Sequence, residues 1–65
     1  DIINNGVDKI LKKIGEEATE LIIAAKNANL NDAKHEISDL LYHIMVLMIE
    51  RGIEWEDIAE EFDKR

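Results

Sequence analysis

Apolar residues recur with a helical period along most of this 65-residue chain, and no proline interrupts the pattern. The stretch ANLN at residues 28–31 and the glycine at position 52 divide the pattern into three segments. No segment alternates as a β-strand does, so the predicted class is all-α. We expect an antiparallel helical hairpin followed by a short C-terminal helix, with helices from Gly6 or Val7 to Ala28, from Asn31 to Arg51 and from Trp55 to Asp63.

Polar residues and a glycine mark the expected helix ends. Asn4 or Asn5 is predicted to cap the first helix and Asn31 the second, because an asparagine side chain accepts hydrogen bonds from free backbone amides. Gly52 fits the position just after the second helix, where a left-handed backbone is common.

The apolar faces indicate more burial than one short chain can provide. A chain of this length buries only about 60% of its unfolded surface, and without cysteine it has neither disulfides nor thiolate metal sites. We therefore expect a helical bundle completed by dimerisation, with a tetramer as the alternative. The first helix has a core stripe with two flanking positions, and the second is apolar around most of its circumference: Val7, Ile10, Ile14, Ala18, Leu21 and Ala25, flanked by Leu11 and Ile22; then Ile37, Leu40, Leu41, Ile44, Met45, Met48 and Ile49.

The net charge of −7 argues against nonspecific binding to nucleic acid or to an anionic membrane. The longest apolar run, LIIAA at residues 21–25, is too short to span a bilayer. An anionic substrate stays compatible with this charge if a divalent cation lies between substrate and protein.

Two carboxylate pairs are the main chemical signal. Glu17 and Glu20 lie on one face of the first expected helix, and Glu36 and Asp39 have the same spacing on the second. In an antiparallel hairpin the two pairs fall at matching heights along one groove. An all-oxygen donor set suits Mg²⁺, with Mn²⁺ as the alternative. The competing interpretation is a solvated acidic face with lysine partners, such as Lys13 with Glu17.

The lysines and histidines near these acids have functional and structural interpretations. Lys9 and Lys13 flank the carboxylates and could contact phosphate oxygens, or they serve only solubility. His43 lies one turn beyond Asp39 and could orient a carboxylate, contact substrate or be a satisfied buried histidine. His35 is expected at the surface. In the last helix, Ile58 and Phe62 are expected to face inward, because their spacing places them on one side.

The motif EExxE, followed by 15 residues and ExxD, resembles the signature of the all-α nucleoside triphosphate pyrophosphohydrolase superfamily, the MazG-like fold. The longer strings GVDKILKKIGEEATELIIAAKN and HEISDLLYHIMVLMIERGIEWEDIAEE are similar to the phosphoribosyl-ATP pyrophosphatase family. The resemblance covers the chain from Gly6 to its last residue. Members usually have another helix upstream, so we expect residues 1–65 to be a single domain lacking the family's N-terminal helix.

The resemblance implies Mg²⁺-dependent hydrolysis of 1-(5-phosphoribosyl)-ATP to phosphoribosyl-AMP and pyrophosphate, the second step of histidine biosynthesis. It also implies a cytoplasmic dimer, sometimes a dimer of dimers. By position, Mg²⁺ would be held by Glu17, Glu20, Glu36 and Asp39. Lys9 and Lys13 would lie near the polyphosphate, and Glu16 would be a further ligand or would orient water.

For the base that activates the attacking water, the candidates are Glu16 and Glu20. Two other functions stay open. One is a house-cleaning pyrophosphohydrolase that acts on non-canonical nucleoside triphosphates. The other is a non-enzymatic helical dimerisation module whose acids are surface charge.

Overall fold

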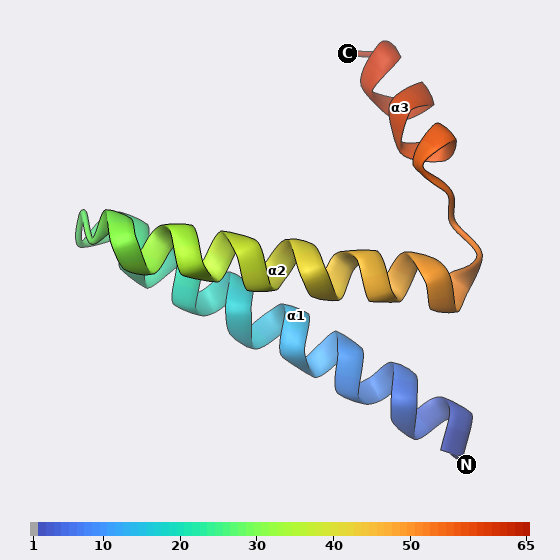
Figure 1. Cartoon of the computed structure of the whole chain (residues 1–65), viewed down its shortest axis with the longest axis horizontal. Coiled ribbons are helices and arrows are strands. Elements are labelled where there is room, and N and C mark those ends of the chain that lie inside the picture. The colour runs from blue at the N-terminus through green and yellow to red at the C-terminus, as the bar shows by residue number, and fades with distance from the viewer. Residues whose placement is uncertain (1) are drawn as a thin grey trace.

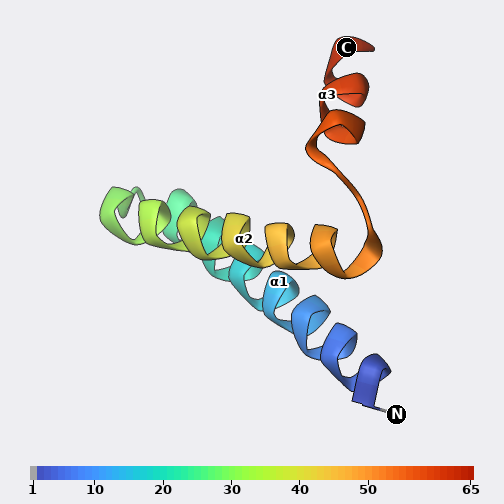
Figure 2. The same ribbon diagram turned by 45° about the vertical axis from the view of Figure 1, so that its right-hand side comes forward.

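The computed structural model describes residues 2–65, with side chains from Gly6 onward, and it is helical throughout apart from short connections. Helix α1 spans Ile2–Lys26, α2 spans Leu30–Arg51 and α3 spans Trp55–Asp63, which confirms the all-α prediction. Helices α1 and α2 form the antiparallel hairpin, and α3 stands away from it beyond the end of α2 (Figure 1). The turned view shows the same separation (Figure 2), and in the described part of the chain only α1 and α2 contact each other.

The turn between α1 and α2 comes earlier in the chain than the sequence predicted. Helix α1 begins at Ile2, so Asn4 and Asn5 lie inside it and not at its start. The cap of α2 is Asn29, two positions before the predicted Asn31, and its side chain accepts a hydrogen bond from the backbone amide of Asp32 at 3.2 Å. The difference arises because Ala28 adopts a left-handed backbone, with φ of 57°, and reverses the chain early.

Helices α1 and α2 end in the same hydrogen-bonding motif. After α1, the amides of Ala28 and Asn29 bond to the carbonyls of Ala25 and Ala24 at 3.1 and 2.9 Å. After α2, the amides of Gly52 and Ile53 bond in the same pattern to Ile49 and Met48, at 3.3 and 2.9 Å. The motif needs a left-handed residue, which glycine adopts without strain and alanine does not. The two turns therefore differ in backbone strain although their hydrogen bonds match.

The hairpin packs along a seam with alternating spacings of three and four residues, as in a coiled coil. Its buried apolar residues are Val7 and Ala24 of α1 and Ala33 and Met48 of α2. The seam follows a 3.5-residue period, so it reaches Ala24 and leaves the predicted Ala25 exposed. It passes through positions 7, 10, 14, 17, 21 and 24 of α1 and through positions 33, 36, 40, 43 and 47 of α2, and the buried Met48 lies next to its last position.

Much of the apolar surface lies outside the seam. On α2, Ile37, Leu41, Met45 and Ile49 form an exposed stripe at four-residue spacing, here called the outer stripe, and Ile49 is 82% exposed. Of the two residues expected to face inward on α3, Ile58 is half-buried, but Phe62 is 66% exposed. The prediction for Phe62 was wrong because α3 packs against no other described element. No described helix is both long and apolar enough to cross a membrane.

Substitutions in the two helix-ending turns are expected to change the free energy of unfolding in opposite directions. Gly52→Ala should lower the free energy of unfolding by about 1–2 kcal/mol, the cost of a left-handed alanine. Ala28→Gly should raise it by up to about 1 kcal/mol, since the strain relieved exceeds the entropy that glycine adds to the unfolded chain. Urea denaturation at one fixed protein concentration measures both, and a shift of the same sign in the two variants would contradict the assignment of strain.

Candidate active site

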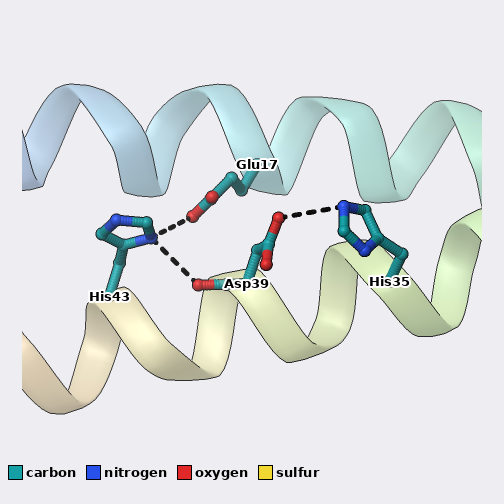
Figure 3. A network of polar contacts seen from close by, with 4 residues as sticks. All are labelled: Glu17, His35, Asp39 and His43. Carbon is teal, nitrogen blue, oxygen red and sulfur yellow. Dashed lines mark hydrogen bonds and ion pairs between the residues drawn. The ribbon is translucent and has the colours of Figure 1, made fainter.

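Three polar residues occupy seam positions between α1 and α2: Glu17, Glu36 and His43. Glu17 extends from α1 toward α2, where its Oε1 lies 2.7 Å from Nδ1 of His43 (Figure 3). The two side chains are only 10% and 23% exposed. Glu17 is the one buried charged residue in the described part of the chain, and His43 is the partner that makes its burial tolerable.

Asp39 is engaged twice, once through its side chain and once through its backbone. Its Oδ2 lies 3.2 Å from Nε2 of His35, one turn earlier on α2 (Figure 3). Its carbonyl oxygen lies 3.0 Å from Nδ1 of His43. His35 is exposed, as predicted, but its pairing with Asp39 was missed, although their four-residue spacing on one helix could have indicated it.

Glu20 and Glu36 form the third contact of the groove. Partial burial raises the pKa of Glu36, and so do its hydrogen bond with Glu20 and the negative charges of Glu20 and Asp39. The nearby His35 acts in the opposite direction. Glu20 and Glu36 also border a hollow of about 260 Å³ beside the α1–α2 turn, together with Asn27, Asn29 and Asp32. This hollow places polar side chains of the turn next to the two acids, which sequence reasoning did not predict.

The four carboxylates predicted to hold a metal all lie along this groove, two from each helix. Their side chains, however, do not gather in the described residues into any group of three or more His, Asp or Glu that could hold a metal ion. Glu17 and Asp39 turn toward histidines, while Glu20 and Glu36 face each other. The donor set fits a hard divalent cation chemically, because it consists of carboxylate oxygens that raise the pKa of one of their number.

The other predicted site residues are exposed on α1. Glu16 borders a shallow depression of α1 together with Glu20, so it reaches the solvent side of the helix. Lys9 and Lys13 lie two turns and one turn before Glu17. Among the ion pairs of the described residues, none joins Lys13 to Glu17, which pairs with His43 instead. The functional roles of Glu16, Lys9 and Lys13 stay predictions.

Comparison with known proteins places the chain in a family. The family model described as "Phosphoribosyl-ATP pyrophosphohydrolase" matches residues 2–65. The chain belongs to the phosphoribosyl-ATP pyrophosphohydrolase family. This confirms the resemblance that the two carboxylate motifs suggested.

Individual members of the phosphoribosyl-ATP pyrophosphohydrolase family are similar to the chain over nearly its whole length. A phosphoribosyl-ATP pyrophosphatase of Leptospira biflexa is 57% identical over 65 residues, which are all of this chain and 71% of the relative. One of Limosilactobacillus fermentum is 53% identical over 64 residues, which are 98% of this chain and 60% of the relative.

A histidine biosynthesis bifunctional protein HisIE of Thermoanaerobacter pseudethanolicus is 60% identical over 60 residues, which are 92% of this chain but 28% of the relative. The chain thus spans only part of the length of the relatives it matches. No solved structure matches it.

The raised pKa of Glu36 predicts a pH-dependent stability. Because the folded chain holds this proton more tightly than the unfolded chain, stability falls as the pH rises from the unfolded to the folded pKa. Glu36→Gln should therefore melt at a higher temperature than the parent at neutral pH, and this difference should vanish below about pH 4. Circular-dichroism melts without divalent cations measure it.

The matched control is Glu60→Gln, which removes an exposed charge from α3. Its melting temperature should follow that of the parent at every pH. A Glu36→Gln variant that is less stable than the parent at neutral pH would show that the ionised carboxylate is not a source of repulsion.

Proposed function

We propose that the chain hydrolyses phosphoribosyl-ATP to phosphoribosyl-AMP and pyrophosphate in histidine biosynthesis. The observation that carries the proposal is the groove between α1 and α2, where each helix of a chain in this family contributes two carboxylates. The names of the relatives, phosphoribosyl-ATP pyrophosphatase and histidine biosynthesis bifunctional protein, support the substrate and the pathway.

The proposed cofactor is Mg²⁺, held by Glu17, Glu20, Glu36 and Asp39. The support is chemical: these residues supply oxygen donors only, and the pKa of Glu36 is raised partly by the neighbouring negative charge. When bound, such an ion would neutralise phosphate oxygens and stabilise the charge on the departing pyrophosphate. It would also offset the repulsion among the acids themselves. In the groove of the described chain, only His35 and His43 compensate this negative charge.

The chain's own residues would bind the substrate and move the proton. Water attacks the α phosphorus, a new P–O bond forms, and the bond to the pyrophosphate oxygen breaks. Glu20 and Glu16 are the candidates to take the proton from that water. Glu20 borders the hollow beside Glu36 and Glu16 does not, and this position favours Glu20 as the base. Lys9 and Lys13 would contact the polyphosphate from the side of α1 that carries Glu16 and Glu20.

A second copy of the chain is the proposed cover for the outer stripe. Exposed apolar surface on this scale is unusual for a stable monomer of 65 residues. At the end of the stripe nearest α3, its residues Met45 and Ile49 line a largely apolar hollow of about 320 Å³ with Met48, Ile53 and Trp55. Pairing two hairpins through their outer stripes would give a four-helix bundle and would bury these residues.

Asp39→Asn tests the catalytic proposal. The parent should release pyrophosphate from phosphoribosyl-ATP in Mg²⁺, and the variant should lose nearly all of this turnover, because one anionic oxygen donor is gone. The parent should also gain roughly 2.7 kcal/mol of stability when Mg²⁺ reaches about 100 times its Kd, and the variant should gain less. Pyrophosphate detection and melts with and without Mg²⁺ measure the two effects.

Glu50→Gln is the control for Asp39→Asn, since it removes an exposed acid from the far end of the same helix. Near-normal turnover by Asp39→Asn would exclude the site. Preference of the parent for other nucleoside triphosphates would instead favour the house-cleaning pyrophosphohydrolase.

Ile49→Ala tests the proposed assembly. On a free hairpin this substitution should change stability by less than about 0.5 kcal/mol, because the side chain is exposed. Under a second copy it should cost about 2–5 kcal/mol and weaken association. Denaturation and sedimentation at several protein concentrations distinguish the two cases, with Lys34→Ala as the exposed polar control on the same helix. A neutral Ile49→Ala in a monomeric parent would contradict the assembly.

A further inference from the structure

His43 makes two contacts through one ring nitrogen, and both partners are acceptors. Nδ1 lies 2.7 Å from Oε1 of Glu17 and 3.0 Å from the carbonyl oxygen of Asp39. A backbone carbonyl has no proton to give, so the contact with Asp39 requires a proton on Nδ1. The same N–H then points into the space between the Asp39 carbonyl and the Glu17 carboxylate (Figure 3).

We propose that His43 is a positioning residue whose Nδ1–H, set by the Asp39 carbonyl, holds Glu17 in its orientation for binding the cation. This inference rests on the function proposed above. It assigns the Nδ1–H of His43 a role toward Glu17, because this proton is already engaged between Glu17 and the Asp39 carbonyl. Carboxylates that bind metals are commonly held in this way by outer hydrogen bonds, whose loss weakens metal binding.

The surroundings of His43 restrict its ring. The side chain is mostly buried in the α1–α2 seam, and its ring makes a T-shaped contact with the neighbouring Tyr42, with 5.0 Å between ring centres and 84° between ring planes. One contact of Nδ1 is with the carboxylate of Glu17 on α1, and the other is with the backbone carbonyl of Asp39, one turn earlier on α2. His43 thus connects acids from the two helices, and it fixes the side chain of one against the backbone of the other.

The two ring nitrogens allow a matched pair of variants. The amide nitrogen of asparagine can replace Nδ1 of histidine, whereas glutamine places its amide nearer to Nε2. His43→Asn should therefore keep a donor for Glu17, and His43→Gln should lose it. We expect His43→Gln to bind Mg²⁺ about 10- to 100-fold more weakly than the parent, and His43→Asn to bind it more tightly than His43→Gln. Calorimetric titration of the full protein with Mg²⁺ measures these affinities.

Val7→Ala controls for loss of stability alone. It shortens a buried apolar side chain in the part of the seam toward the N-terminus and away from the acids. If His43 only stabilises the hairpin, Val7→Ala and His43→Gln should weaken Mg²⁺ binding in proportion to their loss of stability, and His43→Asn should offer no rescue. That result would overturn the proposal.

Nitrogen NMR of the His43 ring tests the proton position without metal or turnover. The proposal requires Nδ1 to be protonated in the folded parent, whether or not Nε2 also carries a proton. A ring with its only proton on Nε2 would overturn it. If the parent shows the Nδ1 proton but no Mg²⁺ binding, the proposed function fails and takes the positioning role with it. If the parent binds Mg²⁺ and the two variants bind equally, the positioning role alone fails.

Discussion

The structure depends on a conflict in the seam between α1 and α2, where polar groups occupy positions that a hairpin normally fills with apolar side chains. Glu17 on α1 and Glu36 and His43 on α2 interrupt a line of apolar residues packed at a 3.5-residue period. Removing a carboxylate from water is unfavourable unless a partner compensates. The 2.7 Å contact from His43 supplies that partner for Glu17, whereas Glu36 meets another carboxylate. The seam therefore carries polar groups at the expense of apolar packing.

The polar residues in the seam explain why so much apolar surface lies outside it. A hairpin with few fully buried apolar residues cannot be held together by its own seam alone, and the outer stripe of α2 carries the apolar area that the seam lacks. If a second copy covers that stripe, as proposed, the hydrophobic contribution to folding comes from outside the acidic groove. The groove would then stay polar and open without loss of the fold, because the acids of the groove and the outer stripe lie on opposite faces of α2.

The sequence was sufficient to predict the class and the number of helices, because the apolar period is long and no proline breaks it. It was less informative at the α1–α2 turn, where Ala28 takes a left-handed backbone that its residue type disfavours and so moves the cap to Asn29. The seam reached Ala24 and not Ala25 because packed helices follow a 3.5-residue period, which differs from the 3.6 of a single helix.

The candidate site was predictable at the level of helix faces but not of side chains. Spacing placed the four acids along one groove, and in the structure Glu20 on the facing helix and Asp39 on the same helix lie near enough to Glu36 to raise its pKa. The contact of Glu17 with His43 depends on rotamers and on the relative height of two helices, which spacing along one helix does not fix. The four-residue spacing of His35 and Asp39, by contrast, could have indicated their pairing. The orientation of Phe62 failed for a different reason: the period of α3 defines an apolar side, but the described chain offers nothing for it to pack against.

Negative charge in the groove is compensated unevenly by the two histidines. Glu17 contacts His43 and the Asp39 carboxylate contacts His35, so one acid from each helix has a histidine beside it. Glu20 and Glu36 chiefly face each other, and they border the hollow beside the turn. The least compensated charge thus lies where the groove is hollowed, and the best compensated acid, Glu17, is the buried one. If a cation binds as proposed, its charge would offset the repulsion between Glu20 and Glu36, while Glu17 is already held by His43.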